Sequence, residues 1–117
     1  MGDVYKNAGQ AGAMGRNAQA HHMNFVQLWQ QASEQIDLQS LATELSKLRE
    51  TLVGEATTAE HHAAIGAVAS AEIEAKQNNG PQVLEYLSKA GNWTLDTATK
   101  IGVVVAASAI KTALGMP

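Results

Sequence analysis

A seam of leucines between residues 38 and 52 constrains the fold more than any other feature of this sequence. Successive leucines are separated alternately by three and four residues, which places them on one narrow face of an α-helix. The run is too short for a coiled coil that is stable alone, so we expect it to pack against other helices, from this chain or from a second subunit. The leucine seam comprises Leu38, Leu41, Leu45, Leu48 and Leu52.

Apolar periodicity and capping residues predict further helices on both sides of the seam. Asp37 is a favourable N-cap for the leucine helix, and Gly54 is expected to end it. Thr57 and Glu60 have the spacing of a capping box, so the next helix should begin there. Asn92 is expected to cap the last helix. The predicted helices cover residues 24–36, 38–53, 57–78, 81–89 and 93–114.

Rows of small residues at four-residue intervals indicate where two helices come close together. Small side chains let helix backbones approach, so a row in residues 57–78 and a row in residues 93–114 are expected to face each other. Glycine inside a helix costs about 1 kcal/mol relative to alanine, which favours a packing role for Gly102. The interface candidates in these rows are Ala63, Ala67, Ala71, Ala98, Gly102 and Ala106.

The first 26 residues follow a different pattern from the rest of the chain. They are poor in leucine and charge, and small residues return at intervals of six, as in the rungs of a β-solenoid. Such rungs bury small side chains only by stacking on neighbours, which predicts self-assembly. The alternative is disorder, because the hydrophobicity is low. The assembly candidates are Ala8, Gly9, Met14, Gly15, Ala18 and Ala20.

The charge balance argues against a nucleic-acid ligand. Against 11 acidic residues stand 8 basic ones, which gives a net charge of −3, and the basic residues are scattered rather than clustered. Phosphate binding requires a concentrated basic face. The sequence has no cysteine for a disulfide or a thiolate, and its start lacks a secretory signal, so we expect an intracellular, cytoplasmic protein.

No motif in the sequence predicts catalysis. There is no Gly-x-Ser-x-Gly elbow and no phosphate-binding glycine loop after a strand, and carboxylates such as Glu72 and Glu74 are expected on solvated helix faces. The pairs His21–His22 and His61–His62 lack metal-ligand spacing, because adjacent helical residues point about 100° apart. We therefore expect no enzymatic activity, no metal and no cofactor.

A membrane-active effector is one alternative function. The uncharged run from Ile101 to Ile110 is about half of the roughly 20 residues that span a bilayer, although its part from Ile101 to Ala107 is apolar on all sides. Trp93, near the start of the same predicted helix, is a residue type enriched at membrane interfaces. On this alternative, residues 93–116 act on the bilayer. The membrane candidates are Trp93, Ile101, Val104, Val105 and Ile110.

The N-terminal stretch also carries a resemblance to known segments. Three stretches carry it: Gly2-Asp3-Val4-Tyr5, Gly9-Gln10-Ala11-Gly12-Ala13-Met14-Gly15 and Ala18-Gln19-Ala20-His21. They resemble the start of small uncharacterised bacterial proteins and are similar to the short prokaryotic amyloid-signalling segments attached to effectors in cell-death and phage-defence systems. The resemblance implies that residues 1–23, the assembly segment, nucleate ordered stacking of a linked domain.

These observations predict an all-α domain over residues 24–117, a bundle of four to five helices. A short extended or β-solenoid-like segment, residues 1–23, precedes it. The expected function is that of a non-enzymatic homo-oligomeric assembly protein, in which the assembly segment stacks or pairs between subunits. A second alternative is a monomeric helical adaptor that binds another protein through the leucine seam.

Overall fold

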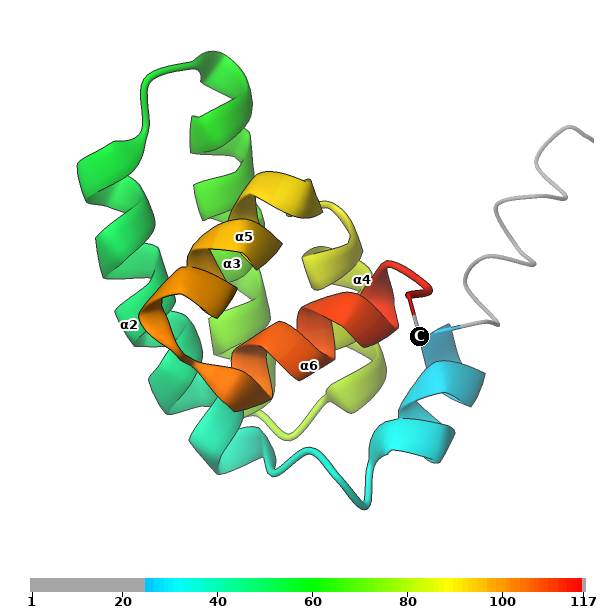
Figure 1. Cartoon of the computed structure of the whole chain (residues 1–117). Coiled ribbons are helices and arrows are strands. Elements are labelled where there is room, and N and C mark those ends of the chain that lie inside the picture. The colour runs from blue at the N-terminus through cyan, green and yellow to red at the C-terminus, as the bar shows by residue number, and fades with distance from the viewer. Residues whose placement is uncertain (1–24, 117) are drawn as a thin grey trace, which may run out of the picture.

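The computed structural model describes residues 25–116, and all regular structure within that range is helical. The all-α prediction is thereby confirmed for the described part of the chain, whereas the predicted extended or solenoid-like segment lies outside it. A first helical segment covers residues 25–32 and is followed by five helices (Figure 1). They are α2 Leu38–Glu55, α3 Ala59–Lys76, α4 Gly80–Ser88, α5 Gly91–Ile101 and α6 Val104–Ala113.

The two longest helices, α2 and α3, form an antiparallel hairpin, and both begin at a local side-chain cap (Figure 1). The carboxylate of Asp37 accepts hydrogen bonds from the Ser40 hydroxyl at 2.7 Å and from the Ser40 backbone N–H at 3.1 Å. The hydroxyl, followed by the N–H, lowers the pKa of Asp37. Thr58 caps α3 by accepting from the backbone N–H of His61 at 3.1 Å. The predicted cap at Asp37 is therefore present.

The shorter helices complete the core around this hairpin. α4 contacts α3 and α6, whereas α5 and α6 both contact α2 and lie across one face of the hairpin (Figure 1). The core contains leucines of α2 and α4 together with many alanines, because closely approaching backbones leave room only for small side chains. The alanines that are fully buried in this core are Ala71, Ala75, Ala98, Ala106 and Ala109.

The predicted single helix over residues 93–114 is wrong, because the chain breaks at Gly102. This glycine has φ 78° and ends α5, and its backbone N–H donates to the carbonyl of Ala98 at 3.1 Å. Positive φ strains residues with a Cβ, which explains a glycine at the corner. A Cβ at position 102 would have no atom within 4 Å, so the expected close packing of helices against Gly102 is absent. The break raises the helix count above the predicted four to five.

Three other predicted helix boundaries are also corrected. α2 continues past Gly54 to Glu55. α3 is capped by Thr58 rather than Thr57, because the Thr57 N–H instead donates to Nδ1 of His61 at 3.1 Å. α5 begins at Gly91 without a side-chain cap, so Asn92 does not serve as one. Each of these three boundaries moved by one or two residues, which is the range over which helix ends commonly vary because their last turns fray.

Candidate functional site

The six assembly candidates cannot be placed in this fold. Residues Ala8, Gly9, Met14, Gly15, Ala18 and Ala20 all lie outside the described residues. Their role in self-assembly stays a prediction from the sequence. The other candidate sites lie within residues 25–116.

The leucine seam lies inside the domain. Leu41, Leu45, Leu48 and Leu52 are fully buried, and Leu38 is half-buried at the start of α2. They belong to one core with residues of α3, α4, α5 and α6. The partner helices that the seam requires are therefore supplied by this chain. In this fold, the four buried leucines present no surface to a second protein.

Most small-residue candidates share the same core, although two are exposed. Ala67, Ala71, Ala98 and Ala106 are buried. Ala63 lies on the exposed side of α3, and Gly102 is exposed at the corner between α5 and α6. The two rows consequently do not run face to face along their whole length, because the second row is divided between two helices.

A buried carboxylate joins α2 to α3, contrary to the prediction that Glu72 lies on a solvated face. The Glu72 side chain is only 9% exposed and accepts from Nε of Arg49 at 2.9 Å, while Nζ of Lys76 lies 3.3 Å from its other oxygen. Burial alone would raise the pKa of Glu72, but the hydrogen bonds and positive charges of Arg49 and Lys76 outweigh it, and the pKa is lowered. This ion cluster therefore fixes the two long helices to each other.

A second carboxylate supplies a helix cap from a distance. Oε1 of Glu44 on α2 accepts from the backbone N–H of Ala106 at 2.8 Å. Ala106 lies in the first turn of α6, which has no side-chain cap of its own. The carboxylate thus satisfies a donor that the helix leaves open and places negative charge at the positive end of the helix dipole. The start of α6 is accordingly fixed by α2.

The tip of the hairpin is tied to α5 by an aromatic stack. The rings of His61 and Trp93 lie 3.8 Å apart between centroids, at an interplanar angle of 13°. Trp93 is half-buried, and its indole is thus already engaged by the domain. This contact gives the tryptophan a packing role, and the sequence offered no signal for its histidine partner.

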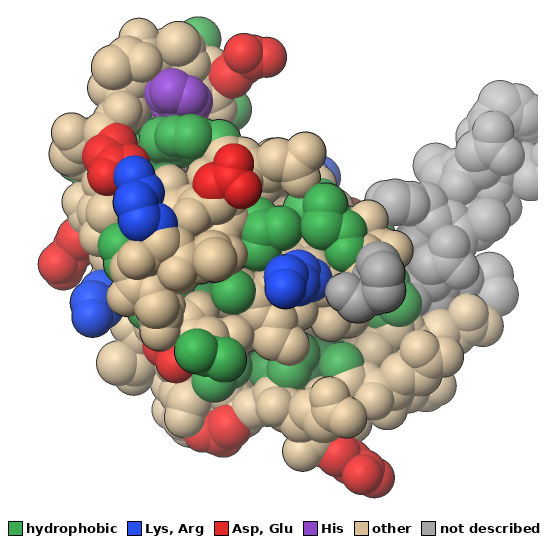
Figure 2. Space-filling view, in the orientation of Figure 1, with side chains coloured by type: hydrophobic (Ala, Val, Ile, Leu, Met, Phe, Trp, Pro, Cys, Tyr) green, Lys and Arg blue, Asp and Glu red, His purple; other side chains and the backbone are tan. Residues whose placement is uncertain are grey.

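The membrane candidates differ in exposure. Val104, at the start of α6, is 73% exposed, whereas Ile110 is fully buried, and Ile101 and Val105 are half-buried. A shallow pocket of about 270 Å³ lies beside Val104 at the corner between α5 and α6. On the face seen in Figure 2, hydrophobic side chains form several separate patches rather than one continuous surface. Isolated apolar residues of this kind are normal on a folded domain.

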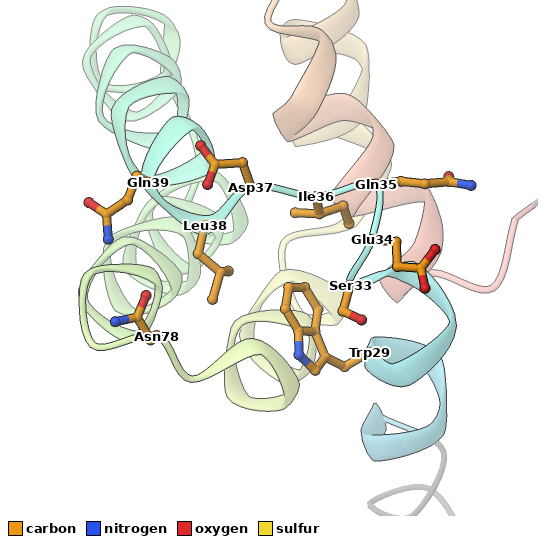
Figure 3. A pocket seen from close by; sticks show the side chains of 9 residues that line it. All are labelled: Trp29, Ser33, Glu34, Gln35, Ile36, Asp37, Leu38, Gln39 and Asn78. Carbon is orange, nitrogen blue, oxygen red and sulfur yellow. The ribbon is translucent and has the colours of Figure 1, made fainter.

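A larger open cleft follows the turn between the first helical segment and α2 (Figure 3). Its volume is about 450 Å³, and it is lined by residues 33–39 with Trp29 and Asn78. In the close-up, Trp29 rises toward Ile36, while Glu34 and Gln35 point outward on the other side. The carboxylate of Asp37 is occupied as the cap of α2. Three of the lining side chains, those of Trp29, Ile36 and Leu38, are apolar, and the other six are polar.

The indole of Trp29 also lies directly on the backbone at the start of α4. A Cβ at position 80 would overlap three ring atoms of Trp29, so only glycine fits beneath the ring. Gly80 is buried as a result. The sequence around Gly80 gave no sign that an aromatic residue 51 positions earlier in the chain covers the glycine.

The described residues contain neither a metal-binding cluster nor a helix able to span a membrane, and the chain has no match among known proteins. Within residues 25–116, no group of three or more His, Asp or Glu side chains is placed to hold a metal ion. None of the described helices is long and apolar enough to cross a membrane. No family model, curated protein or solved structure matches the chain.

Proposed function

We propose that this chain is a non-enzymatic homo-oligomeric assembly protein in which the assembly segment joins subunits and the helical domain is the part that is joined. The observation that carries the proposal is the use of the leucine seam inside the domain. Four of its five leucines have no exposed surface. The leucine seam, which the sequence suggested as an association surface, is therefore buried within one subunit. Of the association candidates that the sequence named, the six-residue rungs of the assembly segment remain.

The resemblance of the assembly segment to prokaryotic amyloid-signalling segments supports a more specific role. Segments of that class order a linked effector by stacking. The same resemblance is the basis for proposing a role in bacterial cell-death or phage-defence signalling. A compact domain that buries most of its large apolar side chains is suited to be held at high local concentration without associating through its own surface.

The test uses two matched substitutions in the full chain. If residues 1–23 form the predicted rungs, the sequence order is expected to place Ala18 inward and Gln19 outward. Ala18→Glu buries a charge in the stack and is expected to abolish association, whereas Gln19→Glu adds the same charge at the next position and should retain it. Sedimentation velocity over a range of concentrations measures both. A wild-type chain that stays monomeric at every concentration, or equal loss in both variants, would contradict the proposal.

The second candidate, a membrane-active effector, rests on the exposed side chain of Val104. Its 73% exposure beside an apolar pocket is the feature that favours it. Val104→Glu in the full chain should then reduce leakage of dye-loaded vesicles. Val53→Glu, which introduces the same charge at an exposed valine of α2 outside this pocket, serves as the control. Equal leakage from wild type and from both variants would remove this candidate.

A further inference from the structure

Asn79 and Gly80 join α3 to α4, and the fold requires each of these residue types. Asn79 caps α4, since its side-chain carbonyl accepts from the backbone N–H of Gln82 at 3.4 Å, near the outer limit of a hydrogen bond. Gly80 must lack a Cβ, because the indole of Trp29 lies on it. The cap and the packing together place an exposed asparagine directly before a glycine.

We propose that Asn79–Gly80 is a site of spontaneous deamidation and that docking of Trp29 restrains the reaction. The chemistry needs only water. The Gly80 amide loses its proton to solvent, and its nitrogen attacks Cγ of Asn79. The bond from Cγ to Nδ2 then breaks, the departing nitrogen takes a proton from solvent and is released as ammonia, and a succinimide ring remains. Glycine offers the least hindrance to this attack because it has no side chain.

Water then opens the ring at either carbonyl. Attack at Cγ breaks the new bond and restores the backbone, with aspartate at position 79. Attack at the backbone carbonyl carbon leaves the chain running through Cβ and Cγ, which is isoaspartate. In both cases one water is consumed and one ammonia is released, and no oxidant or reductant takes part.

The structure supplies both the reactivity and the restraint. Gly80 is the first residue of α4, where backbone N–H groups have no acceptor within their own helix, so its amide is not tied into the helical ladder. The cap, however, directs the Asn79 side chain toward Gln82, and Trp29 holds the Gly80 backbone in its helical position. Ring closure requires both to move, and the reaction therefore proceeds from locally opened molecules.

The two products differ in their effect on the fold. Aspartate at position 79 can still cap α4, and its charge is favourable at a helix N-terminus. Isoaspartate inserts an additional backbone atom before Gly80 and moves the glycine from beneath the indole of Trp29. The first helical segment then loses its contact with the start of α4, and the change is not reversed by refolding.

The experiment follows the peptide that contains Asn79 by mass spectrometry while the full chain is kept at mildly alkaline pH. Asn92, which precedes Trp93, is the internal control in wild type and in Trp29→Ala. Wild type is compared with Trp29→Ala, and with Trp93→Ala as a matched loss of an indole elsewhere. We expect Trp29→Ala to speed conversion at Asn79 at least about tenfold, equivalent to about 1.4 kcal/mol of restraint. Trp93→Ala should leave the Asn79 rate unchanged.

Circular dichroism establishes whether Trp29→Ala is folded, and a second measurement covers the case in which it is not. The rate at Asn79 in wild type unfolded by urea should exceed the rate in the folded protein at least about tenfold, because unfolding removes the same restraint. The proposal is overturned if folded wild type and folded Trp29→Ala react equally fast. It is equally overturned if Asn79 in the unfolded chain is no more reactive than Asn92.

Discussion

The α2–α3 hairpin and the α5–α6 pair obtain their helix starts from different parts of the chain. α2 and α3 begin at Asp37 and Thr58, whose side chains accept from amides three residues ahead. α5 and α6 have no side-chain cap in their own sequence, and α6 is capped by Glu44, 62 positions earlier. The hairpin is thus specified locally, whereas the pair depends on the hairpin being in place.

The largest effect is expected from the seam that holds both regions together. Leu45→Ala should lower the free energy of unfolding by about 2–5 kcal/mol, because a fully buried leucine is removed and leaves a cavity. Urea denaturation followed by circular dichroism measures the change. Val53→Ala, at a position that is 59% exposed on the same helix, is the control and should stay within about 0.5 kcal/mol of wild type. Equal effects of the two would show that α2 does not face the core as described.

The ion cluster tests how firmly the two helices of the hairpin are fixed to each other. Glu72→Gln should cost about 1–2 kcal/mol, less than for a fully buried pair, because the Arg49 side chain is 34% exposed and solvent screens its charge. Glu74→Gln, two positions along α3, is the matched control with the same loss of charge. Urea denaturation of both variants gives their free energies of unfolding, and the difference between them is the contribution of the ion cluster to stability.

The same ion cluster makes part of the domain's stability sensitive to acid. Since the pKa of Glu72 is lowered by folding, the folded state binds this proton less readily than the unfolded chain does. The stabilisation is complete above the unfolded glutamate pKa of about 4.3 and is lost as the pH falls through the lower folded value. Unfolding free energies measured from neutral to acid pH should therefore fall less steeply for Glu72→Gln than for wild type. A parallel decline would contradict this.

Replacing a glycine by alanine is expected to change the free energy of unfolding in opposite directions in the two regions. Gly102→Ala should destabilise the domain by about 1–2 kcal/mol, because the residue between α5 and α6 has φ 78°. Gly66→Ala lies within α3, where a Cβ meets no atom within 4 Å, and should stabilise by up to about 1 kcal/mol. Thermal unfolding of both variants checks the signs. If Gly102→Ala were neutral, the corner would not depend on left-handed geometry.

The smallest effect is expected at the long-range cap. Glu44→Ala removes the acceptor of the Ala106 N–H and should cost about 1 kcal/mol. Glu44→Gln keeps a carbonyl acceptor and should cost less, since only the charge is lost. Hydrogen exchange at the Ala106 amide is the measurement, because local opening at the start of α6 raises it before the whole domain unfolds. Equal protection in all three proteins would mean that Glu44 does not hold this helix.

The features that could be predicted from the sequence are those with a local cause. The three-four spacing of the leucines predicted a helix over residues 38–53 and a buried face, and Asp37 was predicted as its cap. Both depend on residues within a few positions of one another. The break at Gly102 could not be predicted in this way, because apolar residues continue on both sides of it and periodicity favoured one uninterrupted helix.

The contacts of the candidate sites were harder to predict, since their partners are distant in the chain. Glu72 and Lys76 have the spacing of an exposed pair on one helix, and only Arg49 from α2 makes the site a buried one. The contact between the Trp29 indole and Gly80 likewise joins two residues whose neighbouring sequence did not indicate that they meet. Sequence periodicity indicates which face of a helix is buried, but it does not specify which residue of another element lies against it.

The cap that Glu44 provides has a consequence for the order of events during translation. On the ribosome, α2 emerges well before α6, and N-terminal parts of a chain generally fold first. The residues of α6 therefore emerge after the helix that carries the Glu44 carboxylate. The start of α6 is capped by that earlier helix rather than by a side chain of its own. In a chain truncated before Val104, the Glu44 carboxylate would therefore lack the Ala106 N–H that it accepts from in the complete domain.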